Sequence, residues 1–172
     1  MTAQPQIELL LKALAQAYDR KSWYGPVLRG SLRGLSAEQA AWRPAADRHN
    51  IWEIAVHAAY WKHRVVNRLV QLRRPQDAAA ESQRFPLTGS DWFPRPLAGD
   101  AGEQAWKEDL KLLAAQHAAL LAGVRELTDA DLPRVPEGRR ASVQDLLLGI
   151  AYHDIYHAGQ IQLLKRLQQG VF

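Results

Sequence analysis

The sequence contains no cysteine among its 172 residues. Disulfide bonds, metal sites built from thiolates and catalysis by a cysteine nucleophile are therefore excluded, and a reducing compartment is favoured. No early segment combines a charged start with the apolar run of a signal peptide, and no uncharged run approaches the length that spans a membrane. These absences predict a soluble, cytoplasmic protein without a membrane partner.

Clustered charge of one sign is also missing. The chain has 22 basic and 18 acidic residues, which gives a formal net charge of +4. A nucleic-acid-binding protein gathers its basic residues on one face or in one arm. Here the basic runs are only the pairs Arg73–Arg74 and Arg139–Arg140, and the helical stretches mix both signs. The pattern is typical of an ordinary solvated surface, so we expect no nucleic-acid partner.

Alternating strand patterns, internal repeats and low-complexity tracts are absent as well. Apolar residues instead recur at steps of three and four, the spacing of amphipathic helices. The long helical stretches are residues 5–20, 51–73, 103–127 and 141–167. With 47% hydrophobic residues the chain can bury a substantial core, so we expect a single domain over residues 1–172.

Helix signals define the connections. Capping pairs, in which Ser or Asn is followed three residues later by Gln, Glu or Asp, mark three helix starts: Ser36 with Gln39, Asn50 with Glu53, and Ser142 with Asp145. Pro26 predicts a kink in the first helix, which resumes over residues 27–35, and Pro75 ends the second long helix.

The connection between the second and third long helices is the least regular part of the chain. Residues 76–102 are rich in proline and glycine, and Phe85, Trp92 and Phe93 indicate a loop that packs on the protein. This connection is long enough to cross a bundle, so the order need not be simply up-down-up-down. The predicted fold is all-α: a four-helix bundle with a kinked first helix and a long connection between helices two and three.

Two histidines interrupt the apolar face of the fourth long helix. His153 and His157 share this face with Leu147, Ile150 and Ile161. Their spacing of four stacks one imidazole a turn above the other, as two ligands of one metal ion require. The alternative is that each is a core histidine with a hydrogen-bond partner.

A third histidine, His57, lies within two turns of the start of the second helix, on or beside its apolar face. Two histidines from one helix and one from another can hold a metal ion and leave a coordination position open, the arrangement of catalytic zinc sites. We therefore expect His57, His153 and His157 to bind one divalent ion. Residue type does not choose among zinc, nickel, copper and iron.

We do not expect the remaining histidines to be among the three main ligands. His117 falls on an inward seam and could be a fourth ligand or line the pocket, but a core histidine with a hydrogen-bond partner is favoured. His49 precedes a helix cap and His63 lies off the apolar stripe, so we expect surface or packing roles for both.

The stretch HDIYH, residues 153–157, differs by one methylene from the metalloprotease pattern HExxH. In that pattern the glutamate is the general base beside a zinc-bound water. Here Asp154 reaches less far, and no strands suggest an extended substrate cleft. A protease is therefore a minority interpretation.

Three segments resemble the DinB/YfiT-like metal-binding four-helix bundles. HDIYHAGQI, residues 153–161, is similar to that superfamily's fourth-helix pattern of two histidines followed by Gly-Gln. NIWEIAVHAAYW, residues 50–61, resembles the segment that supplies its first histidine ligand. WYGPVLRGSLRGLSAEQAAWRP, residues 23–44, looks like its first helix and the following turn. The chain departs from the pattern at Ala158, where relatives often have arginine.

The resemblance implies a divalent metal, often nickel or zinc, bound by His57, His153 and His157. It also implies a homodimer, because dimers are common in the family. Characterised members include thiol-dependent S-transferases and a mycothiol-dependent maleylpyruvate isomerase. A low-molecular-weight thiol as co-substrate and a small-molecule substrate are therefore implied here.

Two functions remain open at this point. The first is a metal-dependent enzyme that activates water or a small-molecule thiol, with Asp154, Tyr156 and Gln160 as candidates for supporting roles. The second is a non-catalytic metal-binding dimer. Occupancy of the fourth coordination position by His117 or another side chain would favour the second.

The six tryptophans of the chain also support a dimer, because large aromatic residues are enriched at interfaces. The alternative is a monomer in which the middle loop folds Phe85, Trp92 and Phe93 over the bundle and roofs the metal pocket.

Overall fold

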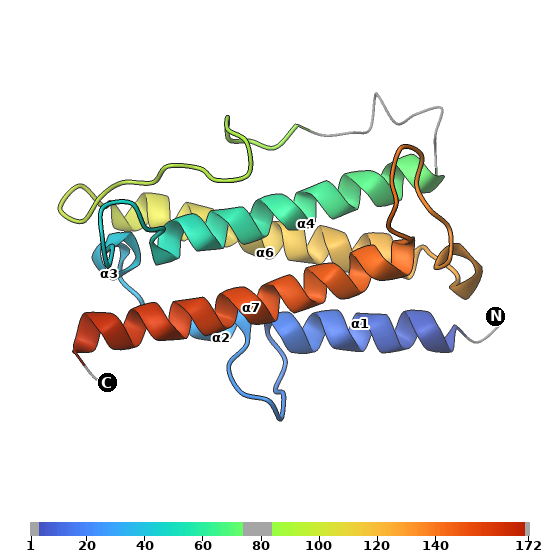
Figure 1. Cartoon of the computed structure of the whole chain (residues 1–172), viewed down its shortest axis with the longest axis horizontal. Helices are drawn as coiled ribbons and strands as arrows, with labels where there is room; N and C mark the ends of the chain where they lie inside the picture. The colour runs from blue at the N-terminus through green and yellow to red at the C-terminus, as the bar shows by residue number, and fades with distance from the viewer. Residues whose placement is uncertain (1–3, 74–83, 171–172) are drawn as a thin grey trace.

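The computed structural model describes residues 4–73 and 84–170, and these ranges contain helices and no strand (Figure 1). The predicted all-α bundle is confirmed. Its long helices are α1 (Pro5–Tyr18), α4 (Ile51–Arg73), α6 (Glu103–Arg125) and α7 (Val143–Gln169). Short elements connect them: α2 (Leu28–Leu32), α3 (Ala37–Ala41) and the 3₁₀ turn η2 (Asp129–Asp131). None of the described helices combines the length and apolar composition needed to cross a bilayer.

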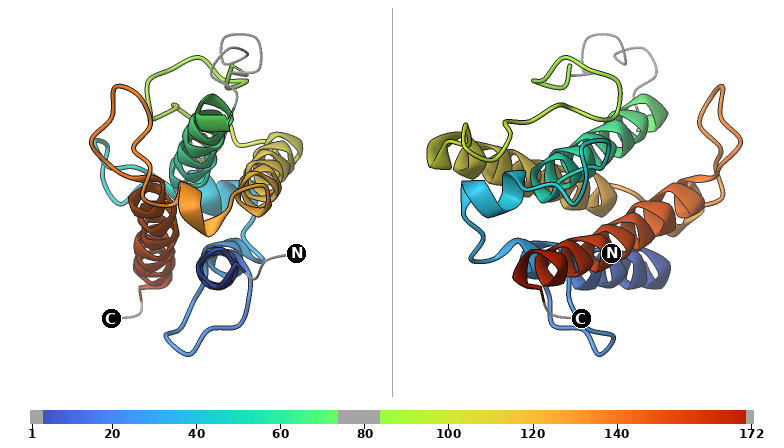
Figure 2. Two further views of the ribbon diagram at one scale, coloured as in Figure 1. Left: turned by 90° about the vertical axis from the view of Figure 1, so that its right-hand side faces the viewer. Right: turned by 60° about the vertical axis from the view of Figure 1, so that its left-hand side comes forward.

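The four long helices form a square in which α4 packs on α6 and α7, and α1 packs on the same two helices (Figure 2). Helices α4 and α6 run in one direction, and α1 and α7 run in the other (Figure 1). The chain must therefore return along the bundle between α4 and α6, and residues 84–102 do so above α4. The order is accordingly not up-down-up-down. The predicted stop at Pro75 and the first part of this connection lie outside the described residues.

The predicted interruption of the first helix is present, but it is wider than a kink. Residues 19–27 form a loop that projects from the bundle between α1 and α2 (Figure 1). Gly25 has a φ of +118°, which a continuing helix of L-residues does not accept, and Pro26 follows it.

The predicted caps form. The Ser36 hydroxyl accepts from the Gln39 amide, and the Ser142 hydroxyl accepts from the Asp145 amide, each at 3.2 Å. Both helix starts are complete capping boxes. These caps fix where α3 and α7 begin, and so which residues of α7 face inward.

The core consists of two apolar clusters separated by a polar layer. One cluster surrounds Trp52 and Trp106 near α3, and the other surrounds Leu69 and Leu147 towards the opposite end. Between them the helices bring together buried polar side chains, listed here by helix: Lys62 of α4, His117 of α6, and Asp154 and His157 of α7.

The centre of the polar layer is an ion pair between the ammonium group of Lys62 and the carboxylate of Asp154. Both side chains are almost completely shielded from solvent, and the ammonium group contacts both carboxylate oxygens. Burial lowers the pKa of Lys62 and raises that of Asp154, whereas each charge stabilises the other. A buried charge is tolerated when it is paired, so the two side chains must meet for α4 and α7 to pack.

We predict that Asp154→Ala lowers the free energy of unfolding of the metal-free protein by about 3–5 kcal/mol, because it leaves the Lys62 charge buried without a partner. Urea unfolding followed by circular dichroism in the presence of a chelator measures this loss. The matched control is Asp47→Ala, which removes an exposed ion pair with Arg48 and should change stability by less than about 1 kcal/mol. Equal effects of the two substitutions would contradict the prediction.

Candidate metal centre

The structure brings the three predicted histidines together. His57 is supplied by α4, and His153 and His157 are supplied by adjacent turns of α7. The Nε2 atom of His153 lies 3.2 Å from Nε2 of His57 and 3.1 Å from Nε2 of His157. One potential ligand atom from each ring lies within 4.8 Å of the other two. The spacing of four residues on α7 therefore places the imidazoles of His153 and His157 next to each other, as the sequence predicted.

Hydrogen bonds on the far side of two rings set their tautomers. His57 Nδ1 lies 2.7 Å from the backbone carbonyl oxygen of Asp91, and His157 Nδ1 lies 2.6 Å from Oε1 of Gln160. Both partners are acceptors, so both Nδ1 atoms carry the proton and both Nε2 atoms present a lone pair. Partners of this kind orient histidines that bind metals.

The convergence of these lone pairs suits a cation. Nitrogen ligands at zinc–nitrogen distances of 2.0–2.1 Å around a tetrahedral ion are separated by about 3.3 Å, close to the two short Nε2–Nε2 distances in the triad. The Nε2 lone pairs of His57 and His157 both face Nε2 of His153, whose Nδ1 has no hydrogen-bond partner among the described residues, so all three Nε2 atoms can bind one ion once the His153 proton is on Nδ1. The donor set of three neutral imidazoles therefore fits a divalent transition metal.

Burial keeps the imidazoles in the neutral form that binds metals. It lowers the pKa of His153 to about 3, with a further contribution from His157, and it lowers the pKa of His157 to about 4. Burial also lowers the pKa of His57, against the opposing effect of its hydrogen bond to Asp91. At neutral pH none of the three needs to lose a proton before it binds a metal ion.

The segment between α4 and α6 covers the triad. The Trp92 ring stacks on His57 with a centroid separation of 3.9 Å and on His49 at 3.6 Å, and it meets the His157 ring edge-on at 6.3 Å. Phe85 and Phe93, which belong to the same segment, are buried. The loop thus packs as predicted, and Trp92 shields the triad from water on the α4 side.

Polar contacts hold this cover in place. The Arg95 guanidinium group contacts Asp109 of α6 at 2.9 Å, and the backbone amide of Arg95 donates to the Glu53 carboxylate of α4 at 3.4 Å. Asp109 also accepts a hydrogen bond of 2.6 Å from the Trp52 indole. The position of the Asp91 carbonyl, and so the orientation of His57, depends on these anchors.

The other histidines do not join the triad. His117 is buried, stacks on Tyr18 at 3.8 Å, and both of its ring nitrogens lack a hydrogen-bond partner within the described ranges. It is a core histidine, as favoured, but without the expected partner. Burial and the nearby charge of Lys62 lower its pKa to about 3. His49 and His63 pack against Trp92 and Phe85, which agrees with the packing roles predicted for them.

The three candidates for supporting roles take different positions. Gln160 bonds to His157, and its amide nitrogen donates to the Tyr156 hydroxyl at 3.0 Å. Asp154 pairs with Lys62 instead of pointing to the triad, so it cannot act as the base of an HExxH protease. Sequence reasoning missed Lys62 and the Asp91 carbonyl. The signal for Lys62 was a lysine within the apolar stripe of α4, whereas a backbone carbonyl leaves no signal in the sequence.

A family model described as the DinB superfamily matches residues 25–161, which is most of the chain. A search of curated proteins and a search of solved structures each found no match. The matched range contains all three histidines of the triad.

We predict that His157→Ala abolishes stoichiometric metal binding and leaves most of the helical content, because four apolar faces form the bundle without needing the metal. Elemental analysis and circular dichroism measure the two properties. A largely unfolded metal-free protein would contradict this prediction.

We also predict that Gln160→Ala weakens metal affinity by about 10- to 100-fold, since it removes the group that fixes the His157 ring. Competition with a chromogenic chelator measures the affinity. Gln169→Ala, an exposed position in the last turn of α7, is the control and should leave affinity unchanged. The same affinity for both variants would show that Gln160 does not orient the ligand.

Proposed function

The chain belongs to the DinB superfamily, and from that premise we propose that it binds one divalent metal ion, nickel or zinc, through His57, His153 and His157. The convergence of the three Nε2 atoms, two of them with the proton fixed on Nδ1, is the observation that carries this proposal. Three imidazole ligands without an acidic group among them favour a transition metal over calcium or magnesium.

The proposed activity is that of a metal-dependent enzyme acting on a small electrophilic molecule with water or a small-molecule thiol as nucleophile. Among the described residues no fourth histidine or carboxylate joins the triad, and His117 is engaged with Tyr18. Three protein ligands with a further position open to a small molecule are typical of catalytic sites. The bound ion would supply positive charge that lowers the pKa of the nucleophile.

The surrounding residues have defined roles in this proposal. The Asp91 carbonyl and Gln160 orient two ligands, and Trp92 excludes water from the α4 side. His153 is the most exposed of the three rings, so a substrate would approach on its side. A thiol co-substrate would also fit the reducing, cytoplasmic compartment that the absence of cysteine favours.

The alternative function is a metal-binding dimer without turnover. A dimer is part of both proposals, and one face of α7 supports it. Exposed residues recur there at steps of three and four: Gly149, Tyr152, Tyr156, Gly159 and Leu163. In an antiparallel pair of α7 helices centred on Tyr156, Leu163 of one chain lies opposite Gly149 of the other. Tyr152 then lies within one residue of the position opposite Gly159, so large side chains lie across from small ones on either side of the two-fold axis.

We predict a dimer mass by light scattering at micromolar concentration, and a monomer mass for Leu163→Glu, which places a charge in the proposed interface. Leu9→Glu is the matched control, because Leu9 lies on α1 and is 67% exposed, against 58% for Leu163. A wild-type monomer would end the dimer proposal.

The catalytic proposal is tested by elemental analysis of the purified protein, followed by assays of low-molecular-weight thiols with an aryl halide and an epoxide. We expect a rate that needs the metal and falls at least about 100-fold in His157→Ala. Stoichiometric metal without any rate above that of the chelator-treated protein would favour the non-catalytic alternative.

A further inference from the structure

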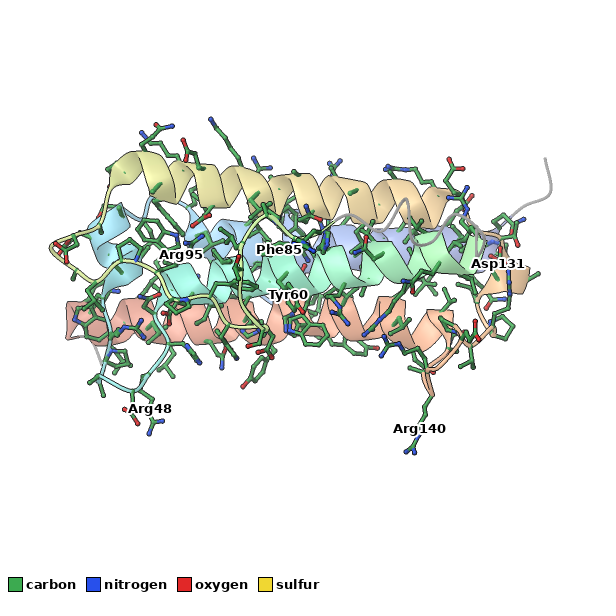
Figure 3. The ribbon with its side chains drawn as sticks, turned by 90° about the horizontal axis from the view of Figure 1, so that it is seen from above. Arg48, Tyr60, Phe85, Arg95, Asp131 and Arg140 are labelled. Carbon is green, nitrogen blue, oxygen red and sulfur yellow. The ribbon has the colours of Figure 1, made fainter. Side chains whose placement is uncertain are left out.

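A cleft of about 590 Å³ lies over α4 on the C-terminal side of the triad. Tyr60 and Phe85 are at one end of it, where the segment between α4 and α6 crosses α4 (Figure 3). Four arginines from three separate segments line it: Arg64 and Arg68 of α4, Arg84 of the crossing segment and Arg139 of the connector before α7.

These four arginines have no acidic partner among the described residues. No lining residue described by the structure is acidic, and none of the four forms an ion pair with a described carboxylate. Elsewhere the chain pairs partly buried arginines closely, for example Arg95 with Asp109. The cleft therefore concentrates positive charge that the described part of the protein leaves uncompensated.

The clearest effect of the uncompensated charge is at Arg68. Its Nε atom is buried and has no hydrogen-bond partner in the described ranges. Burial lowers its pKa, and the positive charges of Arg139 and Arg64 lower it further. Like charges held together in a partly buried cleft repel one another, and a bound anion would relieve both the repulsion and the unmade hydrogen bond.

The cleft and the triad lie along the same helix. Arg64 follows His57 by seven residues, two turns of α4, which is a rise of about 10 Å. The segment that covers them is continuous, with Phe85 to Gly89 over the cleft and Asp91 and Trp92 over His57. A small molecule about 10 Å long could therefore reach from one to the other.

We propose that this cleft binds a multiply charged oxyanion group, a phosphate or a set of carboxylates, on a small molecule. Guanidinium groups form paired hydrogen bonds with both kinds of oxyanion, and arginines from three segments converge on one concave site rather than along a linear track. This inference also rests on the proposed function: the cleft would hold the anionic end of the substrate or co-substrate that reacts at the metal centre.

The test is titration calorimetry of the full chain with inorganic pyrophosphate and with citrate, in metal-free and metal-loaded protein. We expect saturable binding in both forms, weakened at least about tenfold by Arg64→Gln and by Arg68→Gln. Arg84→Gln, at an exposed position that should not affect folding, is expected to weaken binding in the same direction. Preference for pyrophosphate or for citrate separates a phosphate from a carboxylate ligand.

The matched control is Arg140→Gln. Arg140 follows Arg139, but its side chain points away from the bundle (Figure 3). The proposal is overturned if wild-type protein binds neither anion, or if the cleft variants bind as Arg140→Gln does. Displacement of pyrophosphate by a single-stranded oligonucleotide at lower concentration would overturn the small-molecule assignment. Metal content, measured on every variant, distinguishes failure of this site from failure of the metal centre.

Discussion

The buried ion pair between Lys62 and Asp154 is the constraint on which the rest of the bundle depends. Both side chains are excluded from solvent, so neither can keep its charge unless α4 and α7 meet at one rotation and one register. Asp154 directly follows His153, and Lys62 lies five residues after His57. The register that satisfies the pair is therefore the register that brings the triad together. A slip of one helical turn would separate the charges and the histidines at the same time.

A second constraint comes from chain direction. Because α4 and α6 run in parallel, the chain must return along the bundle, and the returning segment lies over the one helix that carries both His57 and the arginine cleft. Anchored through Arg95 and Asp109, it supplies the carbonyl that orients His57 and the ring that covers it. A long connection that a simple bundle would not need thus builds part of both sites.

The sequence was sufficient for local features and for the histidine pair. Capping boxes at Ser36 and Ser142, and the spacing of His153 and His157, depend on positions within one helix, which periodicity reports directly. Apart from the placement of His57 beside this pair, features that depend on contacts between helices were not predicted. The buried face of α7 includes Ala151 and Asp154, whereas the apolar pattern placed Leu146 and His153 on it, and these two are only half-buried. The arginine cleft joins segments 75 residues apart (Arg64 to Arg139), so a survey of charge runs could not detect it.

The polar layer also explains how a metal ion would affect the fold. The two apolar clusters on either side of it are complete without a ligand, so helix packing alone can stabilise the bundle. Beside the ion pair of the layer, three imidazoles converge in a largely buried space, and burial opposes their protonation. A divalent ion can bind all three rings only in the folded state, where the register set by Lys62 and Asp154 holds the rings together. Its binding would therefore add to stability, by about 4 kcal/mol at a free-metal concentration 1,000 times the dissociation constant. The apolar core and the ion pair would then determine the fold, and the metal ion would add to its stability.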